Sequence, residues 1–132
     1  MKKILIIDDD NGVHSIIDVI VRRKMPDCTF IHAYEGLDGI LKACEEKPDV
    51  ILLDVNMPGI DGFETCRRLK QDQRTQDIPI MIFTGMATDT EGLDSAHDCG
   101  ADCVLAKPIN KDDLTESLSA ILDKGKKAGR AG

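Results

Sequence analysis

The sequence predicts an α/β domain in which five short strands, each followed by a helix, form one parallel sheet. Two observations carry this prediction. Short apolar runs alternate along the chain with longer segments whose apolar residues recur at helical spacing. Several runs end in a polar residue that a turn follows, which is typical of the carboxyl edge of an open α/β sheet. Strict alternation of this kind favours parallel strands with right-handed connections.

The first unit begins with the apolar run Lys3–Ile7, an expected strand that leads into three aspartates, Asp8–Asp10. Asn11-Gly12 is typical of a turn. From Val13 onward apolar residues recur at i, i+3, i+4, i+7 and i+8, which predicts an amphipathic helix. This helix is expected to end at Arg22–Lys24, because cations are favourable at the negative end of a helix.

The second unit combines a weaker strand at Cys28–Ala33 with a helix at Glu35–Glu46. The apolar side of this helix is expected to carry Leu37, Ile40, Leu41 and Cys44. The third unit opens with Val50–Leu53, which is apolar throughout and therefore typical of a strand buried on both faces. This strand is expected to end at Asp54, because Met57-Pro58-Gly59 favours a turn.

The third helix is expected to begin at Asp61, with Glu64 as its capping-box partner. A polar loop then leads to a fourth strand at Ile78–Phe83. A second capping box, Thr88–Glu91, predicts the start of a fourth helix, which Gly100 would end.

The last unit consists of a strand at Asp102–Ala106 and a helix that Asn110 caps. At 132 residues the chain is expected to form one domain, over residues 1–123. Residues 124–132 are Gly, Ala and basic residues, and are expected to be a tail or a linker.

Composition excludes several classes of protein. A net charge of −7 argues against a surface that binds nucleic acid. No apolar stretch is long enough to insert into a membrane. The cysteines are odd in number and show no Cys-x-x-Cys spacing, which favours reduced thiols in a cytoplasmic protein. These cysteines are Cys28, Cys44, Cys66, Cys99 and Cys103.

Polar side chains that follow different strands are expected to meet at one edge of the sheet. Asp8 and Asp9 follow the first strand, and Asp54 follows the third. Thr84 follows the fourth strand, and Lys107 follows the fifth. Three carboxylates in one crevice repel one another, and a structural role explains them poorly. A hard divalent cation such as Mg²⁺ takes oxygen ligands, so the sequence predicts a magnesium site.

A metal ion, a nucleophilic carboxylate, a lysine and a hydroxyl group together suit phosphoryl transfer. Asp54 would attack phosphorus in line, while Lys107 and the metal would neutralise charge on the transferring group. Gly85 has no side chain and would leave room for that group. Asp10 is expected to be an exposed acid of the first helical turn rather than a further ligand.

At these motifs the chain resembles the receiver domain of response regulators, the CheY-like superfamily, over residues 2–123. The motifs occur in the order that the family has, and their joint occurrence makes the resemblance specific. They are Asp8-Asp9 after Ile4–Ile7, the stretch Asp54–Gly62, Thr84-Gly85, Gly100–Asp102 and Lys107-Pro108.

The resemblance implies a flavodoxin-like, doubly wound sheet with strand order 2-1-3-4-5 and helices on both faces. It implies that Asp54 is the phosphoacceptor of a two-component system. The donor would be a phosphohistidine on a sensor histidine kinase or on a histidine phosphotransfer protein. Asp9, Asp54 and the backbone carbonyl of Asn56 would bind Mg²⁺ directly, and Asp8 largely through a bound water.

By the same resemblance, Lys107 would pair with the phosphoryl oxygens, and its bond to Pro108 would be cis. Thr84 would turn toward the phosphoryl group and switch the surface of the fourth helix, fifth strand and fifth helix for a downstream protein target. One position departs from the family, because Val104 stands where most members carry an aromatic switch residue. Kinase docking would use Asn11, Gly12, Val13, Pro108 and Ile109.

Ordinary structural roles are expected for the other candidate ligands. His14, His32 and His97 are too dispersed in the sequence to suggest a metal site. His14 is expected to be a solvated surface residue. Cys99 and Cys103 are expected to be packed thiols rather than a redox pair.

Two further functions stay open beside a phosphoacceptor switch that is not an enzyme, either stand-alone or excised from a larger regulator. A phospho-independent interaction module is favoured by Val104 and disfavoured by the intact Asp, Thr and Lys set. A phosphatase of the haloacid-dehalogenase type has Asp-x-Asp after its first strand, which Asp8–Asp10 match. However, Gly12 stands where that family has Thr or Val, and the chain offers no cap domain.

Overall fold

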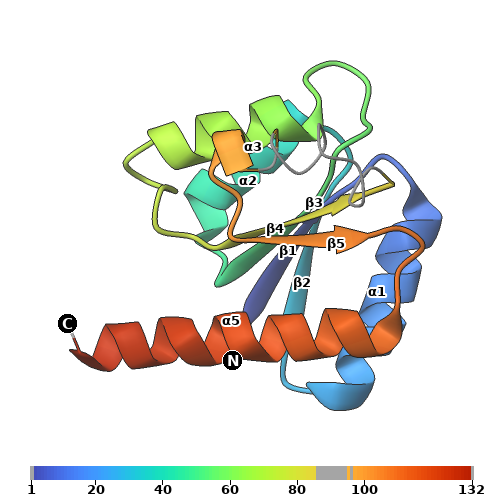
Figure 1. The fold of residues 1–132 in the computed structure, drawn as a ribbon, viewed down its shortest axis with the longest axis vertical. Helices are drawn as coiled ribbons and strands as arrows, with labels where there is room; N and C mark the ends of the chain where they lie inside the picture. The colour runs from blue at the N-terminus through green and yellow to red at the C-terminus, as the bar shows by residue number, and fades with distance from the viewer. Residues whose placement is uncertain (1, 86–94, 96, 132) are drawn as a thin grey trace.

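The computed structural model describes residues 2–85, 95 and 97–131, which form one parallel five-stranded sheet in the order β2-β1-β3-β4-β5 (Figure 1). The strands are β1 (Lys3–Ile7), β2 (Thr29–Ala33), β3 (Val50–Asp54), β4 (Ile80–Thr84) and β5 (Cys103–Ala106). The helices are α1 (Asn11–Lys24), α2 (Gly36–Glu46), α3 (Gly62–Gln71) and α5 (Lys111–Ala131). The expected fold class and strand order are therefore confirmed.

Helices cover both faces of the sheet, with α1 and α5 on one side and α2 and α3 on the other (Figure 1). Successive strand residues point to opposite faces, so Ile4 and Ile6 pack with α1 and α5, whereas Leu5 and Ile7 pack with α2 and α3. Every residue of β3 is buried, as its uniformly apolar sequence predicts.

Helix α2 packs on the sheet through small residues rather than through its leucines. Gly36, Gly39 and Ala43 are buried, while Leu37 and Leu41 are more than half exposed. A Cβ atom at Gly39 would lie 2.4 Å from Cδ1 of Ile7, so only glycine permits this close approach. The expectation that the leucines form the buried side is therefore wrong.

Two helices begin at aspartate caps. The Asp61 carboxylate accepts a hydrogen bond from the Glu64 N–H at 2.9 Å, which confirms the predicted start of α3. Glu64 does not complete the predicted capping box, because its carboxylate pairs with Arg67 and Arg68. Asp10 caps α1 by accepting from the Gly12 N–H at 2.8 Å, so α1 starts two residues before the expected Val13.

Other boundaries also differ from expectation. Strand β4 starts at Ile80 rather than Ile78, because Pro79 has no N–H to donate to a ladder. Helix α5 continues to Ala131, through the segment expected to be a tail or linker. Its lysine, arginine and alanine residues favour helix strongly enough to offset two glycines.

The first part of the predicted fourth helix, with Thr88 and Glu91, lies outside the described residues. Helical backbone is described at residues 95 and 97–99, and Gly100 follows with a φ of +90°. None of the helices over the described parts of the chain is long and apolar enough to cross a lipid bilayer.

Candidate functional site

Three carboxylates meet at the carboxyl edge of the sheet. Asp8 and Asp9 directly follow β1, and Asp54 is the last residue of β3, the strand next to β1. Carboxylate oxygens of the three lie within 4.8 Å of one another. Asp8 and Asp54 are each 3% exposed, whereas Asp9 is exposed to solvent. The parallel arrangement of β1 and β3 thus places these acids side by side.

A single lysine faces this acidic cluster, defined here as Asp8, Asp9 and Asp54, among the residues that the structure describes. Nζ of Lys107 donates a hydrogen bond to Oδ1 of Asp54 at 2.5 Å. Lys107 is held at the end of β5, because its backbone N–H donates to the carbonyl of Thr84 at 3.1 Å. The peptide bond between Lys107 and Pro108 is cis.

The end of β4 contributes a hydroxyl group and an open space. Thr84 is fully buried at the last position of β4. It follows Phe83, the residue that pairs with Asp54 of the neighbouring strand β3. Gly85 follows on the surface, and a Cβ atom placed there would have no neighbour within 4 Å. Space next to a buried hydroxyl is what an incoming polar group requires.

The electrostatics of the cluster favour binding of a cation. Burial of the Asp8 carboxyl group raises its pKa from the ordinary 3.8 to about 6, and the negative charge of Asp54 adds to this effect. The N–H of Asp10 donates to Oδ1 of Asp8 at 2.9 Å and, with the charge of Lys107, opposes the rise. Three carboxylates and one ammonium group leave an excess of negative charge, which fits a hard divalent cation.

The loop after β3 packs tightly against α3. The Gly62 N–H donates to the Val55 carbonyl at 2.8 Å, and a Cβ atom at Gly62 would lie 2.2 Å from the Asp54 carbonyl oxygen. Gly59 has a φ of +79°, which favours glycine. Asn56 lies exposed in this loop. The start of α3 therefore packs against the backbone of Asp54 and helps to hold it in place.

The residues predicted for docking and switching come from three segments of the chain. Asn11, Gly12 and Val13 form the first turn of α1, and Pro108 and Ile109 precede α5. Val13 and Ile109 both pack against the apolar core under α1 and α5. The switch position, Val104, is half-buried in β5 opposite Ile82.

Two histidines that lie far apart in the sequence are in contact. His14 is 3% exposed, so the expectation of a solvated residue is wrong. Its Nδ1 lies 2.7 Å from Nδ1 of His32, and its Nε2 lies 2.8 Å from the backbone oxygen of Asp8. The sequence pattern could have predicted the burial of His14, because it shares one helix face with the apolar Ile17 and Val21 at i+3 and i+7. His97 is exposed.

All five cysteines are free thiols. Cys99, which the sequence analysis considered beside Cys103, instead contacts Cys66 of α3, whose Sγ donates to the Cys99 carbonyl at 3.4 Å.

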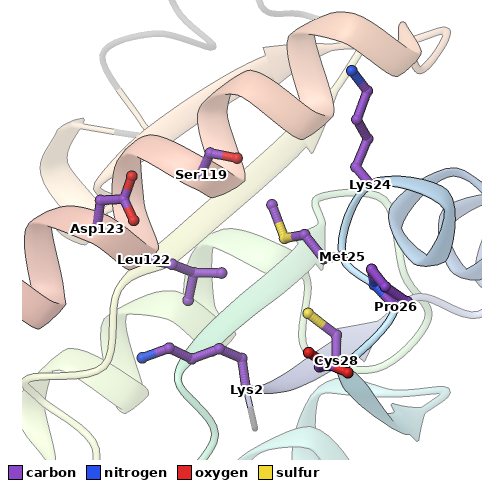
Figure 2. Close-up of a pocket in the computed structure, with 9 residues that line it drawn as sticks. Lys2, Lys24, Met25, Pro26, Cys28, Ser119, Leu122 and Asp123 are labelled. Carbon is purple, nitrogen blue, oxygen red and sulfur yellow. The ribbon is translucent and has the colours of Figure 1, made fainter.

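A hollow of about 470 Å³ lies at the opposite, amino edge of the sheet (Figure 2). It is bordered by Lys2 before β1, by the α1–β2 connection around Met25 and Cys28, and by Leu122 and Asp123 of α5. None of the acidic cluster lines it, so it is separate from the candidate site.

Comparison with known proteins gives consistent matches. The family model for the response regulator receiver domain matches residues 4–119. The DNA-binding dual master transcriptional regulator RpaA of Synechocystis sp. is 34% identical over 122 residues, which make up 92% of this chain and 49% of RpaA. Protein PilH of Pseudomonas aeruginosa is 33% identical over 122 residues, which make up 92% of this chain and 98% of PilH.

Solved structures agree. A CheY-like response regulator receiver domain protein from Methanospirillum hungatei superposes with a TM-score of 0.86 at 26% identity, covering 97% of this chain and 98% of that one. The chain spans about half the length of several curated relatives that it matches, including RpaA, and almost the full length of PilH.

Proposed function

Because this chain belongs to the response regulator receiver domain family, a family of signalling domains, we propose that it accepts a phosphoryl group on Asp54 with the help of Mg²⁺. The observation that supports this most is the buried Asp54 carboxylate, which is paired with Lys107 and flanked by Asp8 and Asp9. The donor would be a phosphohistidine on a sensor histidine kinase or a histidine phosphotransfer protein.

Magnesium would be held by Asp9, Asp54 and the backbone carbonyl of Asn56, with Asp8 acting largely through a bound water. When bound, the ion would neutralise negative charge on the phosphoryl oxygens and on the attacking carboxylate. This assignment is supported by the crowding of three carboxylates and by the raised pKa of Asp8.

In the proposed transfer, a carboxylate oxygen of Asp54 attacks phosphorus. An O–P bond forms while the P–N bond to the donor imidazole breaks, and the imidazole keeps the electron pair and takes a proton. The Lys107 ammonium group, which donates to Asp54 in this structure, would then donate to the phosphoryl oxygens instead. Thr84 would donate its hydroxyl hydrogen to the same group, which occupies the open space at Gly85.

The first turn of α1 and the loop before α5 would dock the phosphohistidine donor. Both segments pack against the same apolar core through Val13 and Ile109, and the second segment directly follows Lys107, which supports this assignment. Phosphorylation would then alter the surface of the fourth helix, β5 and α5, which would bind a downstream protein. Because residue 104 is a valine, this change would proceed without a rotating aromatic ring at that position.

The test is intact mass after incubation with Mg²⁺ and acetyl phosphate. We expect one labile phosphoryl group on the wild type and none on Asp54→Ala. Asp27→Ala, which removes an exposed aspartate at the opposite edge, is the matched control and should be modified like the wild type. The proposal would be contradicted if the wild type stayed unmodified both with acetyl phosphate and with a phosphohistidine protein as donor.

The second candidate is an interaction module that has kept the fold and does not use phosphorylation. Val104 is the observation that favours it. In that case partner binding would be the same for the wild type and for Asp54→Ala. The phosphatase hypothesis is not carried forward, because the receiver model matches residues 4–119.

A further inference from the structure

Three hydrogen bonds hold Asp8, one of the two buried acids of the cluster. Its N–H donates to the Ala33 carbonyl of β2 at 3.1 Å, and its carboxylate accepts from the N–H of Asp10 at 2.9 Å. Its backbone carbonyl oxygen lies 2.8 Å from Nε2 of His14. That carbonyl belongs to the peptide unit between Asp8 and Asp9, so its partner fixes the orientation of the link between two carboxylates of the cluster.

The chemistry of this contact determines where the imidazole protons are. A carbonyl oxygen only accepts hydrogen bonds, so Nε2 of His14 must carry the hydrogen. Nδ1 of a neutral His14 is then an acceptor, and Nδ1 of His32, 2.7 Å away, must donate to it. The two rings therefore hold opposite tautomers, and the chain of donors runs from His32 through His14 to Asp8.

The surroundings hold the two rings in place and disfavour a charge on His32. Burial lowers the pKa of His32 from its ordinary value, and the neighbouring His14 lowers it further. The His14 ring is buried and packs on Tyr34 with ring centres 4.5 Å apart. Phe30 lies on the other side, with its ring centre 6.4 Å from that of His32. Neither imidazole needs to move for the donor chain to form.

We propose that His14 is a positioning residue of the acidic cluster, and that His32 selects the tautomer in which His14 can hold the Asp8–Asp9 peptide unit. This role rests on the proposed function, because the positioned carboxylates are the ones assigned to Mg²⁺. Groups that orient metal ligands commonly change metal affinity by about 10- to 100-fold when they are removed.

The first test reads the tautomers directly, on the metal-free wild type, from the ¹⁵N resonances of both imidazoles. We expect a protonated Nε2 and an unprotonated Nδ1 on His14, and a protonated Nδ1 on His32. The opposite tautomer on His14, or exchange between the two forms, would overturn the proposal. A residue that merely filled space would show no such fixed pattern.

The second test compares Mg²⁺ affinity between variants, followed by the amide resonances of the Asp8–Asp10 loop. His14→Leu removes the donor and should weaken binding by about tenfold or more. His14→Gln can place an amide N–H where Nε2–H now lies, and should restore most of the affinity. His97→Leu is the matched control at an exposed histidine and should bind like the wild type.

The outcomes separate this proposal from the proposed function. Equal Mg²⁺ affinity in the wild type and in folded His14→Leu would refute positioning while leaving phosphoryl transfer intact. If His14→Leu fails to fold, His14→Asn, whose shorter amide falls short of the carbonyl, replaces it in the comparison with His14→Gln. A wild type that binds no Mg²⁺ would refute the proposed function, and the tautomer spectra would then decide on the hydrogen-bonded chain alone.

Discussion

Lys107 has two opposed effects on the Asp54 carboxylate. Its ammonium group compensates for the burial of a carboxylate that is only 3% exposed, which would otherwise be costly. The same contact, at 2.5 Å, occupies an oxygen that a metal ion would use. At the scale of single residues, Lys107 therefore pairs with the buried Asp54 carboxylate and would also compete with a metal ion for it.

We expect Lys107→Met to tighten Mg²⁺ binding and to slow phosphoryl acceptance. Removing a cation that lies next to the proposed metal ligands is worth roughly 1–2 kcal/mol near a protein surface, or about tenfold in affinity. Calorimetric titration and the rate of modification by acetyl phosphate measure the two effects. Lys111→Met, at an exposed lysine of α5, should change neither. Weaker Mg²⁺ binding by Lys107→Met would contradict this account.

The raised pKa of Asp8 predicts how the folding stability of the metal-free protein depends on pH. Its pKa in the folded protein, about 6, lies above the ordinary 3.8, so the folded state holds the proton more tightly than the unfolded state does. Its contribution to stability is therefore complete below pH 4 and is lost as the pH rises through 6. At pH 7 the loss amounts to at most about 3 kcal/mol.

Urea unfolding in EDTA across this pH range tests the prediction. The wild type should lose stability between pH 4 and pH 7 more steeply than Asp8→Asn, which has no carboxyl group to ionise. Added Mg²⁺ should restore stability at pH 7 in the wild type. Identical pH profiles for the two proteins would show that the Asp8 carboxyl group does not carry the effect.

At the scale of elements, α3 packs closely on the end of β3, which carries Asp54. Gly62, the first residue of α3, faces backbone atoms of Asp54 and Val55, and backbone cannot move aside as a flexible side chain can. The position of α3 thus depends on the absence of a side chain at residue 62.

Gly62→Ala should push the start of α3 away from the strand. We expect a loss of roughly 1–3 kcal/mol in the free energy of unfolding, as for other overpacked positions, and slower phosphoryl acceptance on Asp54. Gly85→Ala is the control for stability, because a Cβ atom there meets nothing within 4 Å. Chemical denaturation of both variants gives the comparison, and equal stability of the two would contradict the packing argument.

The sequence was sufficient for elements whose pattern depends on local rules. β3 was predictable because an uninterrupted apolar run fits a strand buried on both faces. The α3 cap was predictable because Asp61 acts on an N–H three residues away. The buried side of α2 was not, because glycines at 36 and 39 bring the helix so close to the sheet that Leu37 and Leu41 stay outside.

The same distinction applies to the site. The meeting of Asp8, Asp9 and Asp54 followed from parallel strands, whose carboxyl ends share one edge. The contact between His14 and His32 joins a helix to an edge strand eighteen residues away, and no local pattern specifies that pairing. Burial of His14 could have been predicted from its helix face, but its partner could not.

At the scale of the whole molecule, the sheet separates two apolar cores. One lies under α1 and α5, the other under α2 and α3. Helix α5 joins its core through Leu114, Leu118 and Leu122, which are all buried. From these contacts we predict that the domain needs α5 only as far as Asp123.

A chain that ends after Asp123 should therefore fold with nearly the stability of the full chain. A chain that ends after Ser117 loses Leu118 and Leu122 and should be destabilised by roughly 3–6 kcal/mol, at about 1.5–3 kcal/mol for each buried leucine. Thermal unfolding followed by circular dichroism compares the two chains with the full one. A marked loss on removing residues 124–132 would place the domain boundary later.

The two cores should accept sequence changes independently of each other. Two of the helices proposed to meet other proteins, α1 and α5, share one core, and α2 and α3 share the other. Side chains on opposite sides of the sheet belong to separate clusters, so we expect the effects of substitutions on stability to add. A lineage could therefore rework the outer surfaces of α1 and α5 for a new signalling partner without having to readjust the packing of the other half.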